Sequence, residues 1–576
     1  MSTALEAASL IMIPTSYSDG LLASAKPNDG AGDFTFARCD GAAQCDLAAT
    51  RVNADGYIEK GYENLLLQSN SFDTTWNTTT SASVTGGQTG YDGSSDAWLL
   101  SKTDSNQYLS QGSISVGLQT FSIYAKAGDS DFVYVRFLTG GERVTFDLQN
   151  GITLGLSGSI DAKIELVSGT TDWYRCSLTA DFNSNVVRIY PAEGNGDTSG
   201  TSGSIYIQDA MLNQGMVAYP YVETTTAPVA GGILEDEPRL DYSGSCPALL
   251  LEPQRTNAFP HSEYFDSTSW TKGGNADIET NAAISPEGIQ NASKLYGSTT
   301  NYTFTRLQGD GALFRQGRTL SIFAKAGEVS EFLFFSGNLG QGPYFNLNNG
   351  SITGYYQGDS SQIDDAYSVN YGNGWYRYVV VFSANSYPRL FSSENQEITF
   401  NQTAGNGIYL YGFQAEQDAT YPTSYIPTYG TSQTRLDEST SVLTLPETLT
   451  DNYTLFFDFK ELIAGNGWVK FVDSSNSVVY VFYSYGGHYD IFNGSSFMVD
   501  VSADPDGKIA LKQSGSSVKI FVNGVDKTKA GATANLTDIA KFAFGAKPSN
   551  NSGTLNQMLV FPKALSDDEC IELTTI

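Results

Sequence analysis

Short runs of β-branched and aromatic residues, separated by Gly, Asn, Ser and Asp, make up most of this 576-residue chain. Residues 132–137 and 375–382 are typical, and runs of this length between turn-forming residues are typical of β-strands. Helical periodicity is nearly absent, and the one helix that the pattern favours lies at residues 566–573. The sequence therefore predicts an all-β protein. Its units should close into sandwiches or jelly rolls, because closure limits exposed strand edges.

The chain also contains an internal duplication. Residues 121–128, Phe-Ser-Ile-Tyr-Ala-Lys-Ala-Gly, return as residues 320–327, Leu-Ser-Ile-Phe-Ala-Lys-Ala-Gly. The offset between matched positions drifts only from 193 to 203 residues, as small loop insertions would produce, so we predict two tandem copies of one domain. Further matched pairs are Asn64 and Asn257, Trp76 and Trp270, Trp98 and Ser293, Phe146 and Phe345, Trp173 and Trp375, Cys176 and Tyr378, Ile205 and Ile408, and Tyr219-Pro220 and Tyr421-Pro422.

Three related tripeptides mark the domain boundaries. Arg51-Val-Asn53, Arg239-Leu-Asp241 and Arg435-Leu-Asp437 each precede a new module. We predict an N-terminal segment at residues 1–50, jelly-roll repeats at residues 51–235 and 236–434, and a different β-rich domain at residues 435–576. In that last domain, Asn523-Gly524 follows a run of β-formers and predicts a tight hairpin turn.

Composition excludes several classes of function. The chain has 62 acidic and 32 basic residues, which gives a formal net charge of −30. This excess argues against a nucleic-acid partner, which needs clustered Lys and Arg, and against docking on an anionic membrane. No stretch has the ~18 apolar residues of a membrane span, so we expect no membrane insertion. The first residues lack the basic start and apolar core of an export signal.

Cysteine and histidine are too scarce for much metal or nucleophile chemistry. Five cysteines without a C-x-x-C pair, and only two histidines, give little material for a disulfide scaffold, a zinc site or a Ser-His-Asp triad. Cys39 and Cys45 could bridge a short loop, although unpaired thiols are the favoured interpretation. We expect no cofactor. Structural calcium would suit such folds, but no residues are assigned to it.

Aromatic residues that do not recur between the copies are candidate glycan-binding platforms. Trp98 aligns with Ser293, and a position that accepts either residue is expected to face outward. Tyr355, Tyr356, Tyr485 and Tyr489 lie on or beside turns and are further candidates, although tyrosines can simply cover a β surface or a subunit interface. The recurring tryptophans at 76, 173, 270 and 375 are expected in the core.

Carboxylate clusters raise the question of a glycosidase, which needs two acids on either side of the scissile bond. The four clusters all lie next to Pro, Gly or Ser in expected loops, which is typical of solvated turn acids. We therefore predict no catalytic residues. The clusters are Glu235-Asp-Glu237, Asp364-Asp365, Asp504-Pro-Asp506 and Asp567-Asp-Glu569.

The duplicated unit resembles a module common in bacteriophage tail and head fibres. The likeness rests on the Asn-Leu-Leu opening at residue 64, the strand at residues 121–128, the Trp-Tyr-Arg strand and the closing Tyr421-Pro-Thr-Ser-Tyr-Ile-Pro427. This module resembles carbohydrate-binding jelly rolls in fold. Residues 435–576 resemble a laminin-G or concanavalin-like sandwich, through Val522-Asn-Gly524, Phe544-Gly545 and residues 553–566. Residues 13–20 and 33–38 resemble the openings of such fibre proteins.

The resemblance implies a structural, non-enzymatic component of a phage particle that contributes to host attachment through glycan recognition. It implies that residues 1–50 dock onto other virion proteins, that the chain forms a homo-oligomer such as a trimer, and that it is made in the host cytoplasm and ends in the virion. Two alternatives stay open. One is a secreted bacterial glycan-binding protein, and the other is a virion polysaccharide depolymerase.

Overall fold

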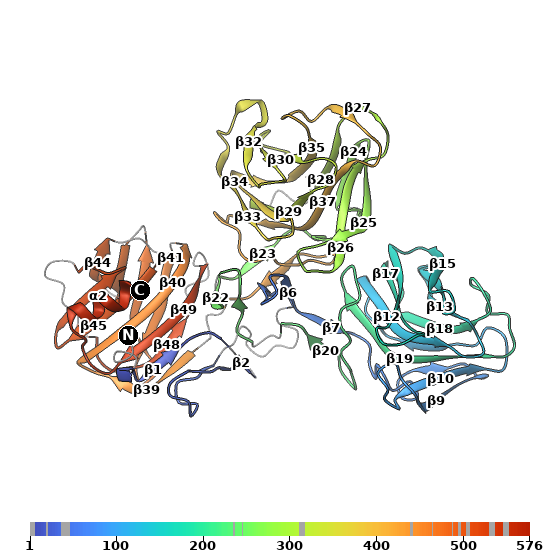
Figure 1. The fold of residues 1–576 in the computed structure, drawn as a ribbon, viewed down its shortest axis with the longest axis horizontal. Coiled ribbons are helices and arrows are strands. Elements are labelled where there is room, and N and C mark those ends of the chain that lie inside the picture. The colour runs from blue at the N-terminus through green and yellow to red at the C-terminus, as the bar shows by residue number, and fades with distance from the viewer. Residues whose placement is uncertain are drawn as a thin grey trace.

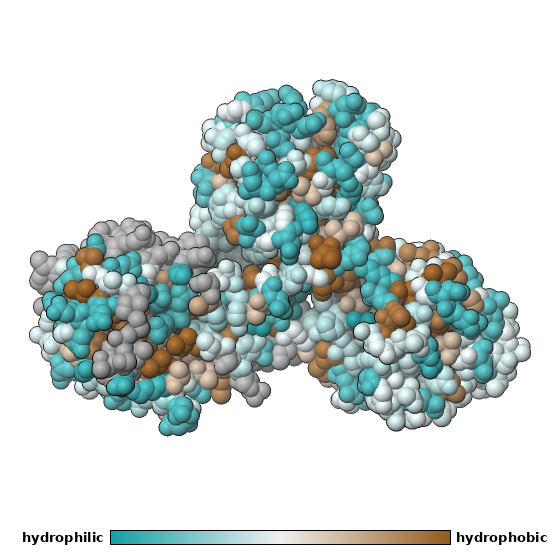
Figure 2. Space-filling model, viewed as in Figure 1, coloured by the Kyte–Doolittle hydropathy of each residue, from teal (hydrophilic) through white to brown (hydrophobic). Residues whose placement is uncertain are grey.

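The computed structural model describes residues 6–575 apart from 16, 19–20, 36–46, 234–236, 245, 310–316, 438–441, 464, 486–487, 493–496, 503–506, 529–535 and 545–551. In some strands beside these gaps it describes only the backbone. Regular structure is almost entirely β-strand, with a terminal helix α2 (Asp567–Thr575), and the predicted all-β class is confirmed. Three β units surround a central junction of short strands (Figure 1). Their visible surfaces are largely hydrophilic or neutral, with brown hydrophobic patches near the junction (Figure 2).

The first jelly roll is built from two six-stranded antiparallel sheets, which we call sheets 1a and 1b. Sheet 1a has the order β16-β17-β12-β19-β10-β9 and sheet 1b the order β15-β14-β13-β18-β11-β8. Their strands are β8 (Asn77–Thr78), β9 (Ala82–Gln88), β10 (Ala97–Lys102), β11 (Leu109–Gly112), β12 (Gly117–Ala127), β13 (Phe132–Phe137), β14 (Arg143–Asp147), β15 (Ile152–Ser157), β16 (Asp161–Leu166), β17 (Trp173–Phe182), β18 (Val186–Ala192) and β19 (Gly203–Gln214).

The second jelly roll repeats this arrangement strand for strand. Sheet 2a runs β25-β26-β37-β29-β34-β33 and sheet 2b runs β24-β28-β35-β30-β31-β32. Their strands are β24 (Trp270–Gly274), β25 (Ala276–Ile284), β26 (Gln290–Gly297), β28 (Thr305–Gly309), β29 (Gly317–Ala326), β30 (Glu331–Ser336), β31 (Pro343–Asn346), β32 (Ile352–Tyr355), β33 (Ile363–Asn370), β34 (Tyr376–Ser386), β35 (Pro388–Ser393) and β37 (Gly407–Glu416). The predicted duplication is therefore confirmed.

Strand register confirms most of the alignment between the copies. Trp98 faces Ile207 across β10 and β19, and Ser293 faces Leu410 across β26 and β37, as their alignment requires. A β-bulge interrupts the pairing of β12 with β19, and an equivalent bulge interrupts the pairing of β29 with β37. Bulges bend a strand at a fixed position, so their recurrence reflects one shared backbone plan.

A buried asparagine holds each jelly roll at the same point. Asn64 donates through Nδ2 to the carbonyls of Ala210 (3.1 Å) and Val222 (2.8 Å), and its Oδ1 accepts the amides of Leu66 and Leu212. Asn257 makes the same four bonds, to Phe413, Ile426, Phe259 and Ala415. A fully satisfied buried amide specifies one local backbone geometry, which explains why the opening Asn recurs.

One matched pair is wrong. Ser69 Oγ lies 2.7 Å from the hydroxyl of Tyr221, and the equivalent Ser262 Oγ lies 2.7 Å from that of Tyr425. Tyr221 is therefore the equivalent of Tyr425, and the match of Tyr219-Pro220 with Tyr421-Pro422 is displaced by two residues. The two Tyr-Pro dipeptides look alike in sequence, but the serine–tyrosine hydrogen bond defines equivalent positions in the fold.

The third unit is a sandwich that includes strands from distant parts of the chain. Sheet 3a has the order β21-β22-β49-β40-β45-β46-β47 with β1 also on β49, and sheet 3b the order β2-β3-β4-β39-β48-β41-β42-β43-β44. Sheet 3a contains β1 (Leu10–Met12), β21 (Leu240–Asp241), β22 (Ala248–Leu251), β40 (Asn452–Ile463), β45 (Gly507–Ser514), β46 (Ser517–Val522), β47 (Val525–Asp526) and β49 (Ser552–Phe561). Sheet 3b contains β2 (Tyr17–Ser18), β3 (Leu21–Leu22), β4 (Phe34–Thr35), β39 (Val442–Leu449), β41 (Gly465–Val472), β42 (Val478–Tyr485), β43 (His488–Phe492), β44 (Phe497–Ser502) and β48 (Ile539–Phe544).

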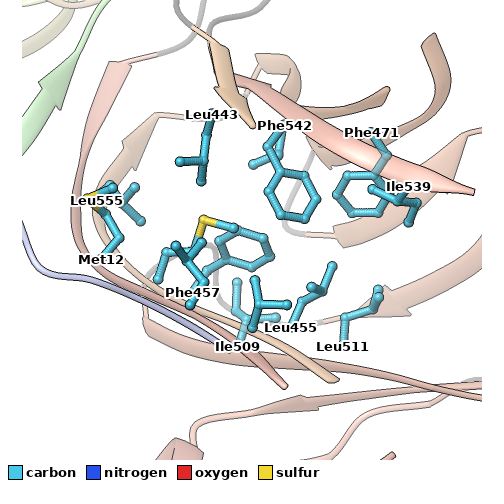
Figure 3. Packing of buried hydrophobic residues seen from close by; sticks show 14 of the residues in the cluster. Met12, Leu443, Leu455, Phe457, Phe471, Ile509, Leu511, Ile539, Phe542 and Leu555 are labelled. Carbon is cyan, nitrogen blue, oxygen red and sulfur yellow. The ribbon is translucent and has the colours of Figure 1, made fainter. Parts of the chain in front are cut away.

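Part of the N-terminal segment, residues 1–50, packs into this unit. Met12 faces Met558 across β1 and β49, and Met12 lies beside Phe457 and Leu555 in the core between the sheets (Figure 3). Leu10 is likewise fully buried, because an apolar run needs an apolar partner and this core supplies one. The predicted boundaries at residues 50, 235 and 434 stay predictions, but strands from both sides of them share these sheets.

Two local predictions in this unit are confirmed. Asn523 and Gly524 have φ of 49° and 79°, the left-handed pair of a tight hairpin turn, and they connect β46 to β47. Helix α2 begins with a capping box, in which Ser566 Oγ accepts the Glu569 amide and the Glu569 carboxylate accepts the Ser566 amide.

A buried lysine lies at the junction of the two jelly rolls. Lys60, at the end of β6 (Ile58–Lys60), places Nζ 2.6 Å from Glu263 Oε1 and 2.8 Å from Glu287 Oε1, and all three side chains are at most 2% exposed. Burial acts to lower the pKa of Lys60, but the two glutamates outweigh it and raise that pKa well above its ordinary value. The hydroxyl of Tyr219, from the first jelly roll, donates to Glu287 at 3.1 Å, so the cluster connects both repeats.

The recurring Arg-Leu-Asp tripeptides have a structural reason. Arg239 and Arg435 are both fully buried, and their Nη1 atoms lie 2.7 and 3.1 Å from the same oxygen, Glu252 Oε2. Burial acts to raise the pKa of Glu252, but the two guanidinium groups outweigh it and lower the pKa to about 2. Arg239 and Arg435 thus anchor the junction, whereas Arg51, in the first marker, pairs with Glu59.

Replacing Lys60 should test whether this junction stabilises the molecule. Lys60→Ala leaves Glu263 and Glu287 buried without their cation, and breaking a buried ion pair costs roughly 3–5 kcal/mol. We expect the first thermal transition in differential scanning fluorimetry to fall by about 10 °C. The matched control is Lys126→Ala, whose ion pair with Asp172 has side chains 33% and 52% exposed and should contribute little. Equal shifts for the two variants would contradict this assignment.

Candidate functional site

Trp98 is not a free aromatic platform. Its ring packs edge-on against Phe72, with centroids 6.2 Å apart, and its indole N–H donates to the Asn70 carbonyl at 2.9 Å. A side chain added at Gly86 would come within 3.3 Å of the ring, so this strand covers it as well. Ser293 at the equivalent position is fully buried. The expectation that this position faces outward is therefore wrong, because both residues lie on the core side of their strand.

The other predicted aromatics lie at or beside the ends of strands. Tyr355 ends β32, and Tyr356 packs edge-on against Phe335 with centroids 5.1 Å apart; both are half-buried. Tyr485 and Tyr489 lie on the adjacent strands β42 and β43, but their side chains are outside what the structure describes. Trp98, Tyr355 and Tyr356 do not line the cavity described below, and the assignment of the five aromatics to glycans stays a prediction.

Recurring tryptophans are buried as expected, but the two fully described acid clusters do not lie in loops, because Asp364 and Asp365 belong to β33 and residues 567–569 form the first turn of α2. Trp76, Trp173, Trp270 and Trp375 are at most 5% exposed, which confirms their place in the core. Asp364 pairs with Arg318, and Asp567 pairs with Lys512 and Lys519. Residues 235–236 and 504–506, and Cys39 and Cys45, lie outside the described residues, while Cys176, Cys246 and Cys570 are unpaired thiols.

A polar cavity of about 340 Å³ opens at one end of the second jelly roll. It lies where β30, β31 and β35 meet the short strand β36 (Phe400–Gln402). The buried side chains of Val329 and Phe400 contribute its apolar part. The amides that line it are those of Asn346, Asn395, Asn401, Gln402 and Asn406.

Some polar groups of this cavity are fixed and others are available. Glu331 accepts hydrogen bonds from Thr353, Ser393 and the Gln396 amide, so it is held in place by the fold. Glu394, Asn395 and Asn401 are exposed, and within the described part of the chain their side chains form no hydrogen bond. A rigid rim that carries unused amide and carboxylate groups can bind a polyhydroxylated ligand by paired hydrogen bonds.

The first jelly roll carries a different residue beside the equivalent place. The position equivalent to Gly297 is Lys102, whose fully buried ammonium group lies 3.3 Å from Glu193, the equivalent of Glu394. In the second copy the side chains of Gln402 and Asn275 take the space beside Gly297, within 3 Å of where a Cβ would lie.

Glu328 lies at the edge of the cavity and pairs with Lys294. Burial acts to raise the pKa of Glu328 at its edge, but hydrogen bonds from Lys294 and from backbone amides outweigh burial and lower it. A general acid in a glycosidase needs a raised pKa instead. In the ranges that the structure describes, no group of three or more His, Cys, Asp or Glu residues could hold a metal ion.

A second polar cluster lies on the outer face of sheet 1a. Asp209 Oδ2 accepts the hydroxyl of Tyr91 at 2.8 Å, and the Tyr91 ring stacks on Tyr124 with centroids 4.0 Å apart. Burial raises the pKa of Asp209 to about 6, and Asp96 adds to the shift, although the hydrogen bond from Tyr91 opposes it. In the second jelly roll the equivalent face is covered by Ile58, whereas here Tyr91 and Tyr124 are half-buried.

Comparison with known proteins yields no family. No family model matches the chain, and no curated protein matches it. Among solved structures, the tandem CBM22-1–CBM22-2 domains of Paenibacillus barcinonensis Xyn10C align at 12% identity over 62% of this chain and 97% of that one, with a TM-score of 0.20. The LG1–3 region of the laminin α2 chain aligns at 10% identity over 79% and 95%, with a TM-score of 0.15. Trypanosoma rangeli sialidase aligns at 9% identity over 92% and 96%, with a TM-score of 0.18. At these scores the similarities support no inference about function.

The described residues include no helix long and apolar enough to cross a membrane.

The cavity residues were not found from the sequence, because asparagine and glutamine between strands look like ordinary turn residues.

The raised pKa of Asp209 predicts a pH-dependent gain in stability from Asp209→Asn. The folded protein holds this proton up to about pH 6, and an unfolded chain releases it near 3.8. Stability contributed by the protonated form is therefore lost as pH rises from 3.8 through 6, at a cost of up to about 3 kcal/mol. The neutral amide avoids this loss and tolerates the left-handed φ of 52°.

We expect Asp209→Asn to raise Tm at pH 7.5 and to change it little at pH 4, as measured by scanning calorimetry. Asp181→Asn, an exposed acid on the same jelly roll, should show no such difference between the two pH values. An equal change in Tm at both pH values would contradict the assigned pKa.

Proposed function

We propose that this chain is a non-enzymatic glycan-binding component of a bacteriophage particle, a fibre or other surface appendage that contributes to host attachment. The observation that supports glycan binding is the cavity of the second jelly roll, with its exposed Glu394 and Asn401 beside the buried Phe400. Amides and carboxylates on a rigid β scaffold, next to a small apolar surface, match the mixture of hydroxyl and C–H groups on a sugar.

The virion assignment is supported by the resemblance of the two repeats and the last domain to fibre modules. In this proposal the surface that docks onto other virion proteins is formed jointly by residues 1–50 and the third sandwich, since β1 to β4 are built into it. The acidic clusters that are described lie in ion pairs or caps, which supports binding without covalent chemistry.

The cavity is tested by the double variant Glu394→Ala/Asn401→Ala. Both side chains are exposed and without hydrogen bonds to the described protein, so their removal should leave Tm unchanged. We expect the affinity for the best neutral oligosaccharide from a glycan array, measured by titration calorimetry, to fall at least tenfold, about 1.4 kcal/mol.

The control is Glu279→Ala, an exposed glutamate on β25 of the same jelly roll. It should bind like the wild type. Binding that survives the double variant, or no binding of any neutral glycan at millimolar concentration, would contradict a glycan site in this cavity.

Assembly is tested by the solution mass of the full chain. A fibre component is expected to form a closed homo-oligomer such as a trimer. Light scattering after size exclusion should then give a multiple of the 62.1 kDa chain mass. A monomer at micromolar concentration would count against the oligomeric part of the proposal.

A further inference from the structure

Three arginines form a row across neighbouring strands of sheet 1b. Arg136 on β13 faces Arg143 on β14 on one side and Arg188 on β18 on the other. The core-facing residues of β13 are Val133, Val135 and Phe137, so Arg136 points away from the core, and its two partners in register do the same. Since strands lie about 4.8 Å apart, the row is about 10 Å long.

No acid neutralises this row. Among the described residues, none of the three arginines forms an ion pair, although the chain has twice as many acidic as basic residues. The Nε atoms of Arg136 and Arg188 are buried and have no hydrogen-bond partner. Both side chains are half-buried, so these donors are lost to bulk water as well.

Such a row is costly for the protein alone. Like charges directly opposite each other on neighbouring strands are destabilising, and an unused buried donor adds to that cost. An anion bound over the row would offset both the charge repulsion and the cost of the unused donors. Guanidinium groups bind carboxylate, sulfate and phosphate oxygens through pairs of hydrogen bonds.

Aromatic rings lie beside the charges. Tyr134 faces Tyr190 on the same two strands, two residues from the arginines, with ring centroids 5.5 Å apart. The guanidinium of Arg188 lies 4.2 Å from the centroid of the Tyr108 ring. Tyr134 and Tyr190 are 9% and 5% exposed, so their rings are buried, and Tyr108 is a half-buried ring beside the row.

The fold itself does not require the row. In sheet 2b the equivalents of Arg143, Arg136 and Arg188 are Gly342, Phe335 and Arg389. Arg389 donates to Gln308 at 2.7 Å and to the Tyr387 hydroxyl, so the one arginine that recurs has partners of its own.

We propose that the outer face of sheet 1b binds an acidic polysaccharide, with Arg143, Arg136 and Arg188 holding anionic groups that are spaced along its chain. This proposal rests on the proposed function and names a charged class of glycan. The site lies on the first jelly roll, whereas the cavity proposed for neutral glycans lies on the second. The anionic groups of the ligand neutralise the three arginines, which form no ion pair with described acids of the protein.

The test uses the full-length protein and three oligosaccharides of equal length. These are a heparin-derived hexasaccharide, a hexamer of galacturonic acid and neutral maltohexaose. We expect one or both acidic probes to bind in titration calorimetry, with affinity that falls as salt is raised, and maltohexaose not to bind at this face. Arg136→Gln/Arg188→Gln should lower the acidic affinity at least tenfold without lowering Tm, because it removes like charges.

Two further variants keep the result clear. Arg143→Gln, at the exposed end of the row, should weaken binding with the least effect on folding, and Arg389→Gln in the second jelly roll should leave binding within twofold of wild type. Unchanged affinity in the double variant, or no binding of either acidic probe at millimolar concentration, would overturn the proposal. Complete displacement of the hexasaccharide by an equal concentration of inorganic sulfate would also overturn it, in favour of a simple anion site.

The variant of the cavity in the second jelly roll shows whether the two proposed glycan sites are independent. Glu394→Ala/Asn401→Ala should retain full affinity for the acidic probe that binds. Loss of neutral binding alone then reports on the cavity, and loss of acidic binding in the arginine variants reports on the row.

Discussion

The arrangement of the two jelly rolls depends on one buried cation. Lys60 and its two glutamates are almost completely removed from water, and their desolvation is repaid only while both ion pairs and the surrounding tyrosine hydroxyls keep their geometry. A hydrophobic contact could slide, whereas this cluster is satisfied in one orientation. The junction thus fixes how the repeats face each other, and with them the directions in which the cavity and the arginine row point.

Duplication has given the molecule two copies of one scaffold with different surfaces. The positions that hold the scaffold together are identical in role, as the four hydrogen bonds of Asn64 and Asn257 show. Other positions differ between the copies: Arg136 corresponds to Phe335, and Lys102 corresponds to Gly297. A backbone plan that does not depend on these side chains allows each copy to change its outer surface without losing its fold.

Much of the fold could be predicted from local pattern and self-comparison. The all-β class, the duplication, the Asn523-Gly524 turn and the helix near residue 570 each follow from short-range chemistry. The interpretation of Trp98 failed because substitution by Ser293 looked like exposure, whereas both residues face the core and the tryptophan fills space near Phe72. The arginine row was invisible because residues 136, 143 and 188 come together only through the register of three strands, which no single run of sequence specifies.

The pairing of β1 with β49 has a consequence for how the molecule is made. Leu10 and Met12 leave the ribosome long before Val560 and Met558 exist, so the first strand has to remain unpaired while both jelly rolls form. The third sandwich is therefore the last unit to close, and it closes through a contact between segments some 550 residues apart. A nascent or cleaved chain without β49 cannot bury its first strand. Burial of that apolar segment therefore waits until β49 has been made, and an exposed hydrophobic strand marks every chain that lacks β49.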